Sequence, residues 1–115
     1  MKTQILGKEG ELQAKKFLEQ HGIEVLEQNY RTKTGEIDFI CRDKQEIVFV
    51  EVKSRMTGAF GEGSEAVNGR KQDKMIKTAL FYLQSNRWDE RPYRFDVISI
   101  LINSNQINHI RNAFP

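Results

Sequence analysis

Two apolar segments joined by a short polar turn constrain the fold of this chain more than any other feature. They span residues 36–42 and 46–53, and the turn between them is Asp43-Lys44-Gln45. This pattern predicts an antiparallel β-hairpin. Both segments carry apolar residues at adjacent as well as alternate positions, which indicates that both faces of each strand are buried. The hairpin should therefore belong to a sheet that is covered on two sides.

The charged residues of this hairpin are unusual, because a charge at the end of an apolar strand needs a partner or a function. With Lys44-Gln45 as a two-residue loop, antiparallel pairing places Asp38 opposite Glu51. A register one residue away would place Asp38 opposite Val50 instead. Glu51 and Lys53 are two residues apart and share one face of their strand. Two carboxylates and an ammonium group should therefore converge at one end of the hairpin.

The remaining pattern predicts one α/β domain over residues 1–115. The expected helices are residues 3–21 and 68–85, and the expected strands are residues 23–28 running on into 29–31, 36–42, 46–53, 94–102 and 107–111. The order is α-β-β-β-α-β-β, around a mixed sheet of about five strands. Ser54–Ser64, directly after the hairpin, is predicted to be a loop.

Two glycines carry structural expectations. Gly35 ends a turn at residues 32–35 and is expected to supply unusual backbone angles there. Gly10 lies inside the first helix, where glycine costs about 1 kcal/mol relative to alanine. It indicates either the close approach of another backbone or of a ligand, or a weak position that the helix tolerates.

Composition bounds the class of protein. A chain of 115 residues, 38% hydrophobic and 30% charged, fits one soluble domain with a small core. It has no apolar run of the roughly 20 residues that span a bilayer, and a charged helical pattern begins too early for a signal peptide, so a cytosolic location without a membrane partner is expected. Cys41 is the only cysteine, and its place in a strand predicts a buried apolar side chain rather than a reactive thiol.

The converging charges of the hairpin have the composition of a magnesium site. Mg²⁺ prefers oxygen ligands and commonly takes one or two carboxylates, and Mn²⁺ is the natural substitute. Asp38 and Glu51 would supply the carboxylates, and the backbone carbonyl of Val52 a third oxygen. Lys53 would then assist the attacking water, which is the set of groups that phosphodiester hydrolysis needs. The structural alternative is a salt bridge between Lys53 and Glu51 or Asp38.

Six basic residues are candidates for contact with nucleic acid. They are Arg31, Lys33, Arg55, Arg70, Lys71 and Lys74. A net charge of only +2 does not identify a nucleic-acid-binding protein by itself, so their distribution matters more. If they border the same edge as the hairpin site, a phosphate-rich partner accounts for all of them together. The alternative for the second helix is an ordinary solvated basic face.

Three further polar residues are not assigned to the candidate site. His21 and His109 stand at the ends of predicted elements, which favours surface or capping roles. Asp96 lies between apolar neighbours in a strand. We expect a structural role for it, paired with Arg94 or Arg111, although membership of the polar cluster is the alternative.

Two stretches of the hairpin resemble a known nuclease motif. Gly35-Glu36-Ile37-Asp38, followed by Phe49-Val50-Glu51-Val52-Lys53-Ser54-Arg55, resembles the PD-(D/E)xK motif, with Asp38 as its aspartate and Glu51-Val52-Lys53 as its ExK tripeptide. More closely, the chain resembles the bacterial YraN-like family of predicted endonucleases, which are related to archaeal Holliday-junction resolvases. The matching blocks are Gly7-Lys8-Glu9-Gly10-Glu11-Leu12-Gln13-Ala14, Asn29-Tyr30-Arg31, Phe60-Gly61, Lys71, Arg94-Phe95-Asp96-Val97 and Ala113-Phe114.

This resemblance implies a restriction-endonuclease-like core, in which a helix packs on a mixed sheet and the site lies on the central hairpin. It also implies that Glu11 is a further acidic residue of the site, reaching it from the first helix, and that Gly10 gives clearance beside the site. The chain departs from the general motif in having Ile37, not proline, before Asp38. The proline is dispensable in related nucleases.

Three hypotheses for the function follow. The leading one is a Mg²⁺-dependent DNA endonuclease acting on double-stranded, branched or otherwise distorted DNA, as a monomer or homodimer. Its catalytic residues would be Glu11, Asp38, Glu51 and Lys53. The second is a nucleic-acid-binding module that keeps the fold without efficient cleavage. The third is a scaffold whose acidic cluster is only structural.

Overall fold

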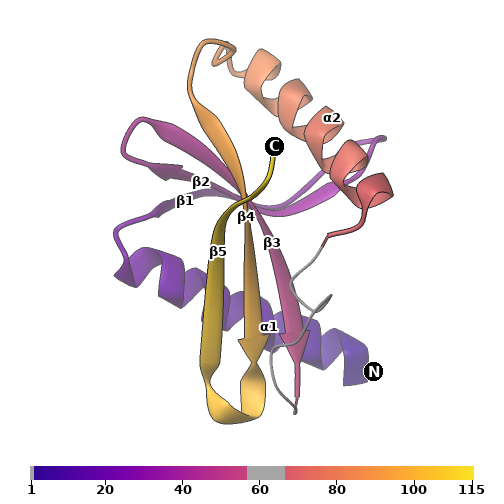
Figure 1. Ribbon diagram of the computed structural model, residues 1–115, viewed down its shortest axis with the longest axis vertical. Coiled ribbons are helices and arrows are strands. Elements are labelled where there is room, and N and C mark those ends of the chain that lie inside the picture. The colour runs from indigo at the N-terminus through magenta and orange to yellow at the C-terminus, as the bar shows by residue number, and fades with distance from the viewer. Residues whose placement is uncertain (1, 57–66) are drawn as a thin grey trace.

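Five strands and two long helices follow one another in the order that the sequence predicts (Figure 1). The structure is a computed structural model that describes residues 2–56 and 67–115. Its elements are α1 (Lys2–Gln20), β1 (Glu24–Arg31), β2 (Glu36–Asp43), β3 (Glu46–Arg55), α2 (Gly69–Ser85), β4 (Tyr93–Leu101), the short 3-10 helix η1 (Ile102–Ser104) and β5 (Gln106–Phe114). Of the loop expected at Ser54–Ser64, residues 54 and 55 belong to β3 and residues 57–64 lie outside the described part.

The strands form one mixed sheet in the order β1-β2-β3-β4-β5. Neighbouring strands are antiparallel, except that β3 and β4 run parallel. The parallel pair arises because the chain leaves the end of β3, crosses back through α2 and begins β4 at the edge of the sheet where β3 also begins. The hairpin of β2 and β3 therefore lies at the centre of the sheet, as the resemblance implies.

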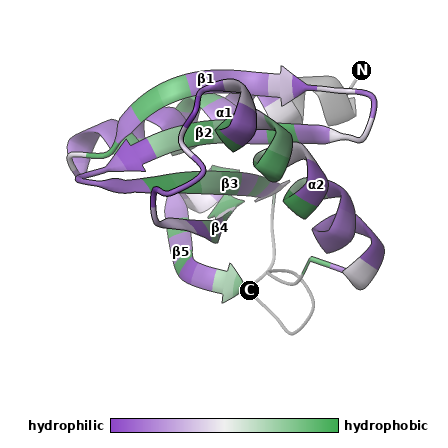
Figure 2. Ribbon diagram, turned by 90° about the horizontal axis from the view of Figure 1, so that it is seen from above, coloured by the Kyte–Doolittle hydropathy of each residue, from purple (hydrophilic) through white to green (hydrophobic). Residues whose placement is uncertain are grey.

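Each face of the sheet is covered by one helix, which confirms that the hairpin is buried on two sides. One buried cluster joins α1 to the sheet and includes Ala14, Leu18, Phe39, Val48, Val50 and Ile98. The other joins α2 to the opposite face and includes Ile37, Phe49, Met75, Ala79, Leu83 and Val97. Hydrophobic residues follow β3 and the part of α2 nearest to it in Figure 2.

Gly10 is the point at which α1 passes closest to β3. A Cβ atom built on Gly10 would lie only 1.7 Å from Ser54 Oγ and 2.9 Å from Ser54 Cβ. The expectation of a close approach is therefore correct, and the neighbour is a side chain at the end of β3. Because α1 has no side chain at this point, it can lie directly over the end of the hairpin that carries Asp38 and Glu51.

Gly35 lies in ordinary packing contact with α2 and does not supply unusual backbone angles. The expectation of unusual angles is wrong, since Gly35 is not among the described residues with a positive φ. A Cβ atom at Gly35 would lie 3.4 Å from Lys74 Cβ and from Thr78 Oγ1. The turn at residues 32–35 thus packs directly against α2, and this contact brings the two elements together at one edge of the molecule.

The regular alternation of side chains in β2 is interrupted at Asp38. Ile37 belongs to the cluster beneath α2, whereas Phe39 belongs to the cluster beneath α1. Residues two apart in a regular strand share one face, so the backbone must depart from regularity between them. The pairing of β1 with β2 sets Asn29 across from this position, and Asn29 has a left-handed φ of 54°. Both strands are therefore irregular where the candidate site begins.

Candidate functional site

The β2–β3 turn sets the register that the sequence predicts. Asp43 pairs with Glu46 across the two-residue loop, and the ladder continues as far as Phe39 paired with Val50. The alternative register, with Asp38 opposite Val50, is excluded because Val50 already pairs with Phe39. Asp38 therefore follows directly on the last pair of the ladder, at the end of the hairpin that also carries Glu51.

A cavity of about 260 Å³ opens at this end of the hairpin. It is lined by residues of four elements, namely Gly7 and Glu11 of α1, Asp38 of β2, Glu51, Val52 and Ser54 of β3, and Lys71 of α2. The cavity brings together Glu11, Asp38 and Glu51, three of the four residues expected to be catalytic. Positions that are 40 residues apart along the chain meet here because α1 crosses one face of the hairpin and α2 starts beside the other.

Asp38 is held in place by the backbone of the neighbouring strand. The Val52 N–H donates a hydrogen bond of 2.8 Å to Asp38 Oδ2. Burial of the Asp38 carboxyl group, then the charge and hydrogen bond of Glu51, raise the pKa of Asp38 to about 8, and the charge of Glu11 adds to this shift. The carboxyl groups are thus crowded enough that one proton is retained near neutral pH.

Glu51 is buried and forms an ion pair with Lys71 of α2. The side chain of Glu51 is only 5% exposed, whereas that of Lys71 is 49% exposed. Burial lowers the pKa of Lys71, but the hydrogen bond and charge of Glu51 outweigh it, so the net shift is upward. The structural alternative to a metal site was a salt bridge between Lys53 and Glu51 or Asp38, and it stays a prediction. The ion pair described for Glu51 is the one with Lys71.

Glu11 reaches the cavity from α1 and is oriented by β1. Its Oε1 accepts hydrogen bonds from Asn29 Nδ2 at 3.2 Å and from Gln28 Nε2 at 3.5 Å. The left-handed backbone of Asn29 is what turns this side chain toward the helix. Reasoning from individual residues missed Asn29, and only its membership of a family block singled it out.

A second, shallower cavity of about 530 Å³ adjoins the first. It shares Gly7 and Glu11 with the first cavity and is also lined by Lys8, Asn29, Arg31 and Glu36. Arg31, one of the expected nucleic-acid-binding residues, therefore lies beside the acidic site, where it forms an ion pair of 3.3 Å with Glu36. The two cavities together make a continuous depression along α1 and β1.

The other basic candidates lie in two places. Lys74 stands where Gly35, at the end of the turn that contains Lys33, packs against α2. Arg70 is exposed in the first turn of α2, next to Lys71. Arg55 is exposed at the last position of β3. Of the six basic candidates, Lys71 and Arg31 are the two that line the cavities beside the acidic residues.

Lys53 lies two residues beyond Glu51 on β3. In the register with β4 it pairs with Ser99, and it is partly buried. It is not among the described residues that line the cavity. Its expected role beside the attacking water is therefore still a prediction.

Asp38 and Glu51 are the side chains best suited to share a cation. Both line the cavity, and burial followed by the negative charge of Glu51 raises the pKa of Asp38. Within residues 2–56 and 67–115, no group of three or more His, Cys, Asp or Glu side chains is arranged to hold a metal ion alone. A site for Mg²⁺ would therefore rest on two carboxylates, backbone oxygen and water, which is the usual composition of such sites.

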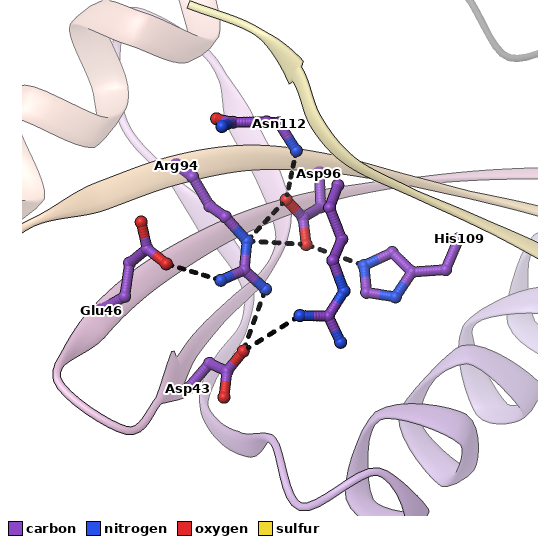
Figure 3. Close-up of polar contacts among 7 residues, drawn as sticks. Asp43, Glu46, Arg94, Asp96, His109 and Asn112 are labelled. Atoms are coloured by element: carbon purple, nitrogen blue, oxygen red, sulfur yellow. Dashed lines mark hydrogen bonds and ion pairs between the residues drawn. The ribbon is translucent and has the colours of Figure 1, made fainter.

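A second group of charged side chains lies at the opposite end of the hairpin (Figure 3). Arg94 is only 8% exposed and is surrounded by carboxylates. Its Nε donates to Asp96 at 3.0 Å, Nη1 to Glu46 at 2.7 Å and Nη2 to Asp43 at 3.2 Å. Arg94 thus ties β4 to both sides of the β2–β3 turn.

Asp96 has the structural role that the sequence predicts. Its carboxylate is fully buried, pairs with Arg94 and accepts a hydrogen bond of 3.0 Å from the Asn112 N–H. Burial alone would raise the pKa of Asp96, but the hydrogen bonds it accepts outweigh burial and lower it. Arg111 pairs with Asp43 at 3.5 Å, so of the two expected partners Arg94 is the correct one.

The two histidines differ in how far their side chains are exposed to solvent. His21 is exposed, and its Nδ1 donates to the Phe17 carbonyl oxygen at 2.8 Å, as expected for a residue at a helix end. The same expectation for His109 is wrong. Its side chain is 8% exposed, and Nε2 lies 2.7 Å from Asp96 Oδ2. The error arises because β5 returns beside β4 and turns this ring inward, which local sequence does not reveal.

Cys41 is fully buried beneath α1, as expected for a small apolar side chain. Burial raises the pKa of its thiol to about 12, so the sulfur stays protonated at neutral pH.

No helix in the described ranges has the length and apolar character needed to cross a membrane.

Comparison with known proteins places this arrangement in a family. The uncharacterised protein family UPF0102 matches residues 10–100. A UPF0102 protein of Sulfurihydrogenibium sp. (strain YO3AOP1) is 47% identical over 94% of this chain and 92% of its own length. UPF0102 proteins of Clostridioides difficile (strain 630) and Thermodesulfovibrio yellowstonii are 46% and 48% identical over 91% and 95% of this chain, and over 92% and 95% of their own lengths. The match includes both strands of the hairpin, α2 and most of α1 and β4, and the chain therefore belongs to the UPF0102 family.

Proposed function

We propose that this protein is a metal-dependent DNA endonuclease that hydrolyses phosphodiester bonds with Mg²⁺ or Mn²⁺. The observation that carries the proposal is that Asp38 and Glu51 line one cavity, where burial and then the neighbouring charge of Glu51 raise the pKa of Asp38 to about 8. The ion pair between Lys71 and Glu51 does not remove this shift of the Asp38 pKa, which a divalent cation shared by the two carboxylates would reverse.

The donor set fits a hard divalent cation. Asp38 and Glu51 would hold the ion, with the backbone carbonyl of Val52 as a further oxygen ligand. When bound, Mg²⁺ would polarise a phosphoryl oxygen and ease the loss of a proton from the attacking water. The Val52 N–H donates a hydrogen bond to Asp38 Oδ2. This bond fixes the direction in which Asp38 presents its charge.

The remaining residues would serve the substrate and the water. Glu11, oriented by Asn29, would hold or orient a water at the side of the cavity nearest α1. Lys53 would offset the negative charge that develops on the phosphate. Arg31 lines the second cavity and would bind a neighbouring phosphate of the strand, and the exposed Lys33, Arg70 and Lys74 would bind phosphates further along it.

The resemblance to junction resolvases makes branched or otherwise distorted DNA the substrate to test first. The protein should be incubated with four-way junction, flap and linear duplex DNA, with Mg²⁺ or Mn²⁺ and with a chelator. We expect cleavage in the presence of the metal, and its loss in Asp38→Asn and in Glu51→Gln by a factor of about 100 or more.

Matched controls are available on the two helices. Asp73 of α2 and Glu19 of α1 are exposed carboxylates away from the cavity, so Asp73→Asn and Glu19→Gln should cleave like the wild type. Binding of DNA without cleavage on any substrate would favour a nucleic-acid-binding module. Absence of DNA binding at low salt would contradict both and leave a structural role for the acidic cluster.

A further inference from the structure

The ammonium group of Lys71 occupies the place in the cavity where a cation for Glu51 would be needed. Lys71 and Glu51 line the same cavity, and Lys71 Nζ is paired with Glu51 Oε2. The carboxylate is 5% exposed and so depends on this partner, while half of the Lys71 side chain remains in contact with solvent. Lys71 therefore approaches from outside, through the open side of the cavity.

The position of Lys71 in α2 is unfavourable for a lysine. α2 begins at Gly69, and the Asn68 side chain caps it by accepting a hydrogen bond of 2.9 Å from the Lys71 N–H. A positive charge in the first turn is repelled by the helix dipole, and this turn has no acidic residue to offset the charge. The cap holds Lys71 in this place nevertheless. Its favourable partner comes from a different element, Glu51 of β3.

We propose that Lys71 is a resident counter-ion that a divalent cation must displace from Glu51 in order to bind. The proposal rests on the proposed metal-dependent function. A carboxylate oxygen in a cavity of about 260 Å³ cannot be shared by an ammonium group and a divalent cation without strong repulsion between the two positive charges. Binding of the metal therefore exchanges one cation for another.

This exchange has two consequences. Without metal, Lys71 pairs with Glu51 and holds it in place, so the buried carboxylate does not lack a partner. With metal, the flexible side chain of Lys71 is released at the open side of the cavity, where the phosphate of a bound strand would lie. Lys71 thus affects metal binding through Glu51, which it holds in position until the metal arrives.

The first test measures metal affinity rather than activity. Mn²⁺ is titrated calorimetrically into wild type, Lys71→Gln, Lys71→Arg and Lys77→Gln, each freed of metal beforehand. Lys71→Gln should bind Mn²⁺ about fivefold or more tightly than the wild type, because the competing charge is gone. Lys71→Arg keeps the charge and should bind like the wild type. Lys77, exposed on the same helix, is the control and should show no change.

The second test uses the wild type alone and does not depend on the folding of any variant. Lysine side chains are labelled with an amine-reactive reagent, with and without Mn²⁺, and the labelling of each lysine is followed by mass spectrometry. Metal should raise the labelling rate of Lys71 severalfold and leave that of Lys77 unchanged. If Lys71→Gln proves unfolded, this measurement decides the question.

The outcomes separate this inference from the proposed function. Tighter binding by Lys71→Gln, or metal-dependent labelling of Lys71, supports the exchange. Equal or weaker binding by Lys71→Gln, with binding abolished in Asp38→Asn, would overturn the exchange and leave the metal site intact. Absence of Mn²⁺ binding in both wild type and Lys71→Gln would overturn the exchange and the metal site together.

Discussion

At the scale of single residues, the molecule tolerates an unfavourable arrangement at Asp38. The carboxyl group is largely removed from water and lies beside the charge of Glu51, yet it accepts a hydrogen bond from the Val52 backbone. Burial and charge favour the neutral form of Asp38, and the hydrogen bond favours the charged form. The first two effects are the larger, since the net shift of the pKa is upward.

This imbalance predicts that Asp38→Asn stabilises the metal-free protein. The pKa of Asp38 is about 8 in the folded chain and about 3.8 in the unfolded chain, so the folded state binds the proton more tightly. The contribution of Asp38 to stability is therefore greatest below pH 4 and is lost as the pH rises through 8. Asparagine keeps an acceptor for the Val52 N–H without the charge. We expect a gain of about 1–3 kcal/mol at pH 8, measured by urea denaturation in chelator.

The pH dependence provides the check on this prediction. The gain from Asp38→Asn should shrink toward zero as the pH is lowered to 4, because the wild-type carboxyl group is then protonated. Asp73→Asn, on an exposed carboxylate, should change stability little at either pH. A gain that did not vary with pH would indicate that the effect is not due to the ionisation of Asp38.

At the scale of elements, the site depends on how closely α1 lies over β3. The absence of a side chain at Gly10 lets the helix approach Ser54, and the same approach brings Glu11 into the cavity. A helix held further away would carry Glu11 out of reach of Asp38. The contact between α1 and β3 therefore both stabilises the fold and brings the residues of the site together.

Gly10→Ala and Gly7→Ala should have opposite effects on stability. Alanine is favoured over glycine in a helix by about 1 kcal/mol. At Gly7 a Cβ atom would meet no described atom within 4 Å, so Gly7→Ala should stabilise by up to this amount. At Gly10 the contact with Ser54 should reverse the sign and destabilise by about 1–2 kcal/mol. Thermal denaturation of both variants tests this, and stabilisation by Gly10→Ala would contradict the close approach.

The Arg94 network predicts a contrast between two arginines that share Asp43. Arg94 is buried and serves three carboxylates, so Arg94→Met should destabilise by about 3–5 kcal/mol by leaving buried charges without a partner. Arg111 is 56% exposed at a distance of 3.5 Å from Asp43, so Arg111→Met should change stability by about 0.5 kcal/mol or less. Denaturant unfolding of the two variants measures both. Equal effects would show that burial does not govern this cluster.

Local sequence predicts those features that depend on neighbouring residues. The two-residue loop at Lys44-Gln45 was sufficient to set the register and so to bring Asp38 and Glu51 to one end of the hairpin. The order of the elements followed from periodicity and turn residues in the same way. These predictions succeed because turn geometry and side-chain alternation act over a few residues.

Features that depend on the packing of distant elements could not be predicted from local sequence. Glu11 was found only through the family resemblance, since its role depends on α1 crossing β3. Lys71 was expected to bind nucleic acid, but its pairing with Glu51 requires the relative placement of α2 and β3. The inward turn of His109 depends in the same way on where β5 returns.

At the scale of the whole molecule, basic side chains lie at both ends of the hairpin. The turn at residues 32–35, which contains Lys33, packs against α2 at Lys74. Lys44 and Arg111 line a separate groove at the other end of the hairpin. The net charge of +2 does not show which of these basic residues would contact DNA.

If DNA binds along the edge beside the cavity, its salt dependence should depend on which lysines are removed. Each phosphate contact contributes about −0.9 to the slope of log K against log salt concentration. The double variant Lys33→Gln/Lys74→Gln should therefore lower the magnitude of the slope by up to about 2. Lys44→Gln/Arg111→Gln removes the same charge at the other end and should leave the slope nearly unchanged. Fluorescence anisotropy over a range of salt concentrations measures both slopes. Equal reductions of the slope in the two double variants would indicate that DNA is attracted by the net charge and does not bind along a defined surface.

The hydrogen bond from the Val52 amide to Asp38 makes a backbone proton a spectroscopic reporter of the site. The chemical shift of an amide proton depends strongly on the charge of the oxygen that accepts it. Titration of Asp38, or arrival of a cation beside it, should therefore move the Val52 resonance in an NMR spectrum of the unmodified protein. One backbone signal would thus follow the state of the cavity without a label, a substrate or a substitution.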